Sequence, residues 1–110
     1  MSYAVHITAT AELDLEKAYD HIDNIFKNHQ AAESLLDEAS KQIGALATMP
    51  EKFALVDDPI LKSWGIRFTM IKNYHAFYTV SKEKEQVTVL RILYAKRNWI
   101  YILKKSSAIV

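Results

Sequence analysis

The sequence predicts an α+β protein in which an N-terminal strand and a pair of helices precede three further strands. Apolar residues between positions 11 and 46 recur at helical spacing, whereas those after Gly65 recur with a period of two, which is typical of strands. The 110 residues are enough for one hydrophobic core. We therefore expect a single domain over residues 1–105, followed by a flexible tail over residues 106–110.

The N-terminal part is expected to form a strand and a helical hairpin. Residues 3–8 alternate and are rich in β-branched side chains, which predicts a short strand. Thr8 has the hydroxyl of a helix N-cap, Asn28 is a second candidate cap, and Pro50 must follow the end of the second helix. The apolar stripes of the two helices are Ala11, Leu15, Ala18, Tyr19, Ile22, Ile25 and Phe26, and then Ala32, Leu35, Leu36, Ala39, Ile43 and Leu46.

The C-terminal part is expected to form a sheet. Residues 51–63 show no period and contain turn residues, so we expect a loop of about a dozen residues there. Three strands joined as hairpins then form an antiparallel meander over residues 66–72, 74–80 and 87–94. The helices should cover one face of this sheet and leave the other open. Residues 98–105 are expected to form a short terminal helix.

The charges divide the chain into two opposed parts. Residues 1–61 hold four Lys/Arg against eleven Asp/Glu, a net charge of −7, and residues 62–110 hold ten against two, a net charge of +8. A basic part of this kind attracts a polyanion to one face of a protein whose overall charge is near neutral. The alternative is that the two parts pair with each other across the fold.

Composition excludes several kinds of site. The chain has no cysteine, which excludes disulfides, thiolate metal sites and a cysteine nucleophile and favours a reducing compartment. No His/Asp/Glu cluster has metal-ligand spacing, so we expect neither a metal nor another cofactor. Residues 1–10 do not resemble a signal peptide, and no segment approaches the ~18 apolar residues of a membrane span. We therefore expect a cytoplasmic protein that does not bind membranes.

The candidate functional residues are cationic or aromatic and lie on strands or strand ends of the basic part. They are Arg67, His75, Tyr94, Lys96, Arg97 and Tyr101. Each also has a purely structural explanation, such as solvation of a sheet face or packing at a strand edge. Arg91 is expected to be structural, paired with an acid from the helices.

The relation between Arg67 and His75 depends on the turn that joins their strands. A two-residue loop pairs Ile71 with Tyr74 and puts Arg67 and His75 on opposite faces of the sheet. A three-residue loop pairs Ile71 with His75 and puts them on the same face. We favour the second arrangement, because the inward set on the second strand is then the more hydrophobic one, with Tyr74, Tyr78 and Val80. Arg67 and His75 should then share the uncovered face.

Several stretches together resemble the RelE/ParE superfamily of bacterial toxins from type II toxin–antitoxin modules, which includes plasmid stabilisation proteins. The matching stretches are YAVHIT (3–8), AELDL (11–15), LATMP (46–50), GIR (65–67), NYHAFY (73–78) and VLRILYAKRN (89–98). In order and spacing they cover nearly the whole chain. The resemblance implies a strand, two helices and an antiparallel meander, and a cognate antitoxin protein that wraps the toxin.

The resemblance also implies one of two activities. RelE-like toxins are metal-independent, ribosome-dependent mRNA endoribonucleases, in which the ribose 2′-hydroxyl attacks the adjacent phosphate and basic residues stabilise the developing charge. ParE-like toxins are not nucleases and poison DNA gyrase. We expect the first activity, with growth arrest through inhibition of translation, and keep the gyrase inhibitor as the alternative.

For the nuclease, we expect a catalytic site of Arg67 and Arg97, which match basic positions of the resembled nucleases, and of His75, which is assigned from its own chemistry. The two arginines would bind the scissile phosphate, and His75 would transfer a proton, because its usual pKa lies near neutrality. The expected substrate-binding residues are Lys96, Tyr94 and Tyr101, with the tyrosines stacking on a base.

The sequence departs from the nuclease pattern at the positions for proton transfer. His75 stands where those nucleases usually have an essential arginine, and Tyr94 stands where many members carry histidine. Leu103 aligns with their C-terminal tyrosine, and Tyr101 is only its neighbour. The cationic positions are therefore partly kept, while the positions for proton transfer are not.

Overall fold

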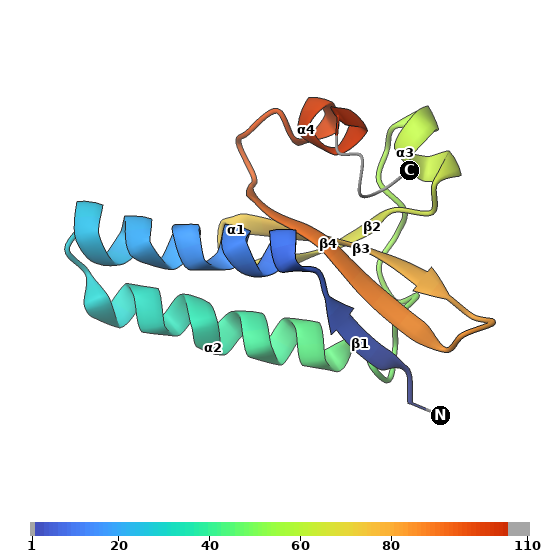
Figure 1. The fold of residues 1–110 in the computed structure, drawn as a ribbon, viewed down its shortest axis with the longest axis horizontal. Coiled ribbons are helices and arrows are strands. Elements are labelled where there is room, and N and C mark those ends of the chain that lie inside the picture. The colour runs from blue at the N-terminus through green and yellow to red at the C-terminus, as the bar shows by residue number, and fades with distance from the viewer. Residues whose placement is uncertain (1, 106–110) are drawn as a thin grey trace.

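A four-stranded sheet forms the centre of the structure, a computed structural model that describes residues 2–105 (Figure 1). The strands are β1 (Ala4–Ile7), β2 (Arg67–Ile71), β3 (Tyr74–Ser81) and β4 (Gln86–Tyr94), in the order β1-β4-β3-β2. The last three form the expected antiparallel meander, and β1 pairs with β4 in parallel. The predicted α+β fold class is confirmed. The tail predicted over residues 106–110 lies outside the described residues.

The two predicted helices form a hairpin on one face of the sheet (Figure 1). Helix α1 (Ala9–Asp20) continues into the π-helical turn η1 (His21–Ile25), and α2 (His29–Ala45) returns beside it. Both predicted caps are confirmed, because the Ala11 N–H donates to the Thr8 hydroxyl at 3.1 Å and the Ala31 N–H donates to the Asn28 side chain at 3.0 Å.

Thr8 also joins α1 to the sheet, because its hydroxyl donates to the Leu90 carbonyl at 3.1 Å. The Thr8→Ala change removes this bond together with the cap. We expect it to lower the free energy of unfolding by about 1–2 kcal/mol, measured by urea denaturation. Thr8→Ser keeps the hydroxyl and should retain most of that free energy. An unchanged stability in Thr8→Ala would contradict this role.

The core between the helices and the sheet follows the predicted apolar stripes for most of their length. Its buried residues are Ala11, Ala18, Leu35, Ala39, Ile43, Leu46, Ile71, Ala76, Tyr78, Val87, Val89 and Ile92. The stripe of the first helix departs from the prediction at its end, where Ile25 and Phe26 are 65% and 66% exposed. The hairpin therefore presents apolar side chains to solvent at its tip.

The opposite face of the sheet was expected to be open, and this expectation is wrong. Two short helices, α3 (Pro59–Ser63) and α4 (Trp99–Lys105), lie on this side of the sheet (Figure 1). Their apolar side chains pack against it. A second buried cluster results, made of Val56, Leu61, Ile66, Phe77, Leu90, Leu93 and Leu103. The segment 51–63 is therefore not simply a loop. Asp58 caps α3 by accepting hydrogen bonds from the Ile60 and Leu61 N–H groups.

The turn between β2 and β3 contains two residues, so the favoured three-residue loop is wrong. Ile71 pairs with Tyr74, and Lys72 has a positive φ of 55° that closes the turn. Arg67 therefore lies on the opposite face of β2 from the one predicted. Thr69, on the same face as Arg67, is buried, and Met70, on the other face, is 44% exposed. Arg67 pairs with Tyr78 on the helix-covered face, and His75 lies on the other.

Candidate functional site

Arg67 is held by the segment that precedes α3. Its Nη1 donates to the Phe53 carbonyl at 2.6 Å, and its Nη2 lies 3.5 Å from a Glu51 carboxylate oxygen. The side chain is only 19% exposed. Its guanidinium is therefore bound by groups of the fold itself. A structural role accounts for Arg67, which is the alternative to a functional one that the sequence left open.

His75 lies on the opposite face, among aromatic rings. The ring centres of Phe68, Phe77 and Trp99 lie 4.4, 5.5 and 5.8 Å from that of His75. Its Nδ1 is buried and has no hydrogen-bond partner among the described residues. Burial lowers the pKa of His75 below its usual value, so the ring is neutral near pH 7. In this state the imidazole is part of an apolar cluster.

The other candidates divide between the two faces. Tyr94 packs edge-on against Tyr74 at 5.6 Å, and Arg97 follows in the turn after β4 with the exposed Lys96 beside it. Tyr94 and Arg97 line one hollow. Tyr101 is 58% exposed on α4, with the Lys105 Nζ 5.6 Å from its ring centre. The structure thus brings Tyr94 and Arg97 together and leaves Arg67, His75 and Tyr101 elsewhere.

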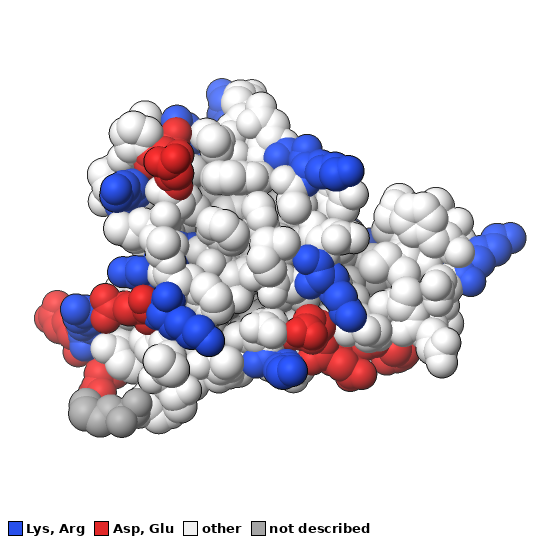
Figure 2. All heavy atoms as spheres, turned by 180° about the vertical axis from the view of Figure 1, so that it is seen from behind, with Lys and Arg blue, Asp and Glu red and all other residues white. Residues whose placement is uncertain are grey.

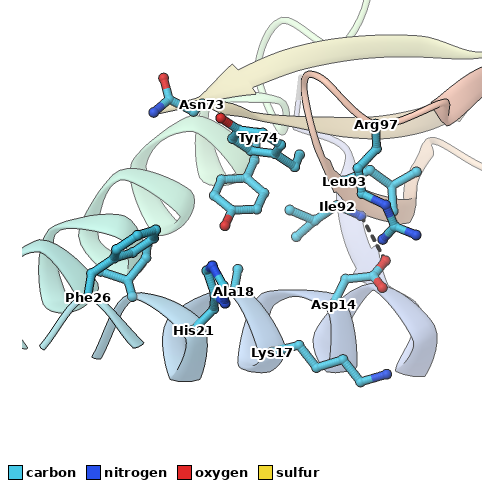
Figure 3. A pocket seen from close by; sticks show the side chains of 12 residues that line it. Asp14, Lys17, Ala18, His21, Phe26, Asn73, Tyr74, Ile92, Leu93 and Arg97 are labelled. Carbon is cyan, nitrogen blue, oxygen red and sulfur yellow. Dashed lines mark hydrogen bonds between the residues drawn. The ribbon is translucent and has the colours of Figure 1, made fainter. Parts of the chain in front are cut away.

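That hollow, of about 670 Å³, lies between the α1–η1 segment and the ends of β3 and β4 (Figure 3). The Tyr74 ring extends into it from the sheet (Figure 3). Further apolar side chains from the α1–η1 segment and from the sheet line the hollow, together with cationic and other titratable side chains. The residues are Asp14, Lys17, Ala18, His21, Ile22, Phe26, Asn73, Tyr74, Ile92, Leu93, Tyr94 and Arg97. We call this the α1–β4 hollow.

The acid that lines the α1–β4 hollow is neutralised within the fold. Asp14 receives two hydrogen bonds from Arg91, at 2.7 and 3.0 Å. It receives a third from the Ile92 N–H at 3.0 Å, which is the dashed line in Figure 3. This confirms the prediction that Arg91 pairs with an acid from the helices. Lys17 and Arg97 form no ion pair within residues 2–105. The hollow therefore carries a net positive charge.

Exposed aromatic side chains extend the α1–β4 hollow outward. Phe26 is 66% exposed and packs edge-on against His21, with ring centres 5.0 Å apart. Tyr94 is 37% exposed on the opposite side. Burial, together with the neighbouring Tyr94, raises the pKa of Tyr74, so its hydroxyl remains a neutral donor. The apolar stripe that continues to Phe26 was the signal for this site in the sequence, but we interpreted the whole stripe as part of the core.

Some of the opposed charges of the two parts of the chain pair with each other across the fold. Four ion pairs join the basic part to the acidic part: Arg67–Glu51, Lys82–Glu51, Arg91–Asp14 and Lys104–Asp58. In Figure 2, blue and red atoms lie together along parts of the edge, while the middle of that face is largely uncharged. The alternative interpretation of the charge pattern therefore holds for these four cations of the basic part.

The architecture described above, with a helical hairpin on one face of a β1-β4-β3-β2 sheet, is the fold shared with solved toxins of the RelE/ParE class. The family model for the ParE toxin of the type II toxin–antitoxin system, parDE, matches residues 5–99. The chain belongs to this family, and the resemblance inferred from its motifs is confirmed. Comparison with curated proteins finds no match.

Solved structures of related toxins share the fold. The chromosomal ParDE system of P. aeruginosa contains a chain that matches with a TM-score of 0.69 at 19% identity, over 86% of this chain and 98% of that one. The RelBE2 toxin–antitoxin complex of Mycobacterium tuberculosis gives 0.59 at 19% identity, over 86% and 99%. A mutant of the E. coli toxin RelE in the free state gives 0.60 at 18% identity, over 96% and 100%.

The described residues contain no helix that is both long enough and apolar enough to cross a membrane. They also contain no group of three or more metal-binding side chains arranged to hold an ion.

Proposed function

We propose that this type II toxin is a non-catalytic inhibitor of DNA gyrase. One observation carries the proposal: the three groups expected to cleave RNA do not converge. Arg67 and His75 lie on opposite faces of the sheet, and Arg97 lines a hollow that contains neither of them. Metal-free RNA cleavage needs a base, an acid and phosphate ligands around one phosphate. The match to the ParE family supports the same choice.

The α1–β4 hollow is the proposed contact with the target. It combines exposed aromatic rings with an arginine, the residue types that dominate binding energy at protein interfaces. Its uncompensated cations favour a target segment that carries acidic groups beside an apolar anchor. An interface of this kind requires no proton transfer, which fits the departures of this sequence from the nuclease pattern.

We also propose that the toxin is a cytoplasmic domain over residues 1–105 with a cognate antitoxin as its partner. Family membership supports that partner, and the P. aeruginosa and M. tuberculosis relatives are described as toxin–antitoxin assemblies. The mRNA endoribonuclease remains the alternative that experiment must separate from gyrase inhibition.

Induction of the toxin in growing cells tests the two activities against each other. We expect double-strand DNA breaks and an SOS response, with transcripts that stay intact in toeprinting assays. The purified toxin should inhibit supercoiling by purified gyrase. Cuts in mRNA at the ribosomal A site, without DNA breaks, would refute the proposal and support the nuclease.

The Phe26→Ala change tests the contact with the target. Phe26 is 66% exposed, so its removal should leave the fold intact while weakening gyrase binding about tenfold or more, measured as the Kd. Ile25→Ala is the matched control, because Ile25 is equally exposed at 65% but does not line the hollow. Equal effects of Phe26→Ala and Ile25→Ala would contradict the assignment.

The His75→Gln variant tests the gyrase inhibitor against the nuclease. It should keep its toxicity, whereas a nuclease that uses His75 would lose it.

A further inference from the structure

His75 and helix α4 meet on the outer face of the sheet. The groups around the imidazole are Phe68 and Met70 on β2, Phe77 on β3, Leu93 on β4 and Trp99 at the start of α4. Each is aromatic or aliphatic. The buried Nδ1 has no acceptor or donor opposite it among the described residues, which is uncommon for a buried polar atom.

Helix α4 is held to the rest of the fold by its apolar side chains, including Ile100 and Ile102, and by one ion pair. Trp99 packs on Phe77 at a ring-centre distance of 5.1 Å, and Leu103 is fully buried in the second cluster. The Lys104 Nζ lies 3.2 Å from a carboxylate oxygen of Asp58, which caps α3. A helix of seven residues has little stability of its own, so these contacts keep it in place.

We propose that His75 is a proton-sensitive contact that controls release of α4 from the sheet. Protonation gives the imidazole a charge and a second N–H donor inside an apolar cluster where the buried nitrogen has no acceptor. Movement of Trp99 away from His75 admits water to that nitrogen. The released helix uncovers Phe77, Leu90 and Leu93, an apolar surface that is closed at neutral pH.

The charged groups on the neighbouring elements are engaged elsewhere. Arg67 on β2 binds Glu51, Arg91 on β4 binds Asp14, and on α4 Lys104 binds Asp58 while Lys105 lies over Tyr101. Tyr74 and Tyr78 on β3 face the helix hairpin. Burial, and not a neighbouring charge, is what lowers the pKa of His75.

The sign of the pH dependence follows from the direction of this shift. The pKa of His75 is lowered in the closed state, whereas in the open state it approaches its usual value of about 6.5. The closed state is therefore most favoured above about pH 6.5 and loses that advantage as the pH falls toward the lowered pKa. Over this window the open-to-closed ratio rises by up to about tenfold per pH unit.

The ion pair of α4 does not titrate in the same window. The Leu61 N–H bond, together with Lys104, lowers the pKa of Asp58 below its usual value, so this carboxylate remains charged. A change near pH 6 therefore reports on a histidine and not on the Lys104–Asp58 contact.

Trp99 reports directly on the movement. The chain has two tryptophans, so a Trp64→Phe variant leaves Trp99 as the only one. On acidification from pH 8 to pH 5 we expect its emission to shift to the red, reversibly, with a midpoint below the usual histidine pKa and with little change in far-UV circular dichroism. In the wild-type chain, the indole N–H resonance of Trp99 should shift over the same pH range, which keeps the test independent of the Trp64 change.

Three further variants separate the proposal from its alternatives. His75→Gln should abolish the transition, and His21→Gln, which removes an exposed histidine, should leave it unchanged. Lys104→Met weakens the closed state and should move the midpoint to higher pH. The proposal is overturned if the red shift persists in His75→Gln, if it is absent from the wild-type chain, or if Trp99 is quenched without a red shift.

Discussion

Replacing Asp14 with alanine should lower the free energy of unfolding by about 3 kcal/mol, measured by urea denaturation. Asp14 accepts three hydrogen bonds that tie α1 to β4, two from Arg91 and one from the Ile92 N–H. The Arg91 and Asp14 side chains are 19% and 12% exposed. Without the carboxylate, a partly buried guanidinium and a backbone N–H lose their partner together, and both groups remain poorly solvated.

An acid on the same helix provides the control for this prediction. Asp20 is exposed and takes part in none of the ion pairs described for residues 2–105, so Asp20→Ala should change stability by less than about 0.5 kcal/mol. A loss below about 1 kcal/mol in Asp14→Ala would mean that the ion pair does not hold α1 on the sheet. Because this contact forms one wall of the α1–β4 hollow, Asp14→Ala should also weaken target binding.

Replacing Phe77 with alanine should cost about 4 kcal/mol of unfolding free energy. The Phe77 ring is fully buried and lies 5.1 Å from Trp99, between the sheet and α4. Its removal leaves a cavity that the neighbouring strands cannot close, because the β-bulge beside it is fixed by pairing on both sides. Equilibrium denaturation in urea gives the difference directly.

Phe26→Ala is the matched control, since it removes the same side chain from a site that is 66% exposed. We expect it to change stability by less than about 0.5 kcal/mol. Similar losses in the two variants would show that the second cluster is not a core. A large loss in Phe77→Ala alone supports the view that both faces of the sheet contribute to stability.

The elements that the sequence predicted correctly depend on local chemistry. Alternation predicted β1, β3 and β4, and the side-chain oxygens of Thr8 and Asn28 predicted the starts of α1 and α2. Pro50 correctly marked a limit for α2. Each of these signals acts within a few residues, so a single sequence contains all of it.

The site could not be predicted in the same way, because it depends on how segments meet. Whether Arg67 and His75 lie on the same face depends on one residue in the turn, because successive side chains of a strand point to opposite faces. The stripe that ends at Phe26 has the same pattern whether it is buried or exposed. Which of the two occurs depends on whether another segment of the chain lies against it.

The sequence by itself determined the order of the strands and of helices α1, α2 and α4, the caps of α1 and α2, and the family, because periodicity, capping and motif order are present in consecutive residues. The tertiary structure alone decided that Arg67 is engaged by Glu51, that Trp99 of α4 packs against the half-buried His75, and that Tyr74 and Arg97 line one hollow with Phe26. Strand register and helix packing set these distances between residues far apart in the chain. A pattern in one segment carries no record of which other segment will lie against it.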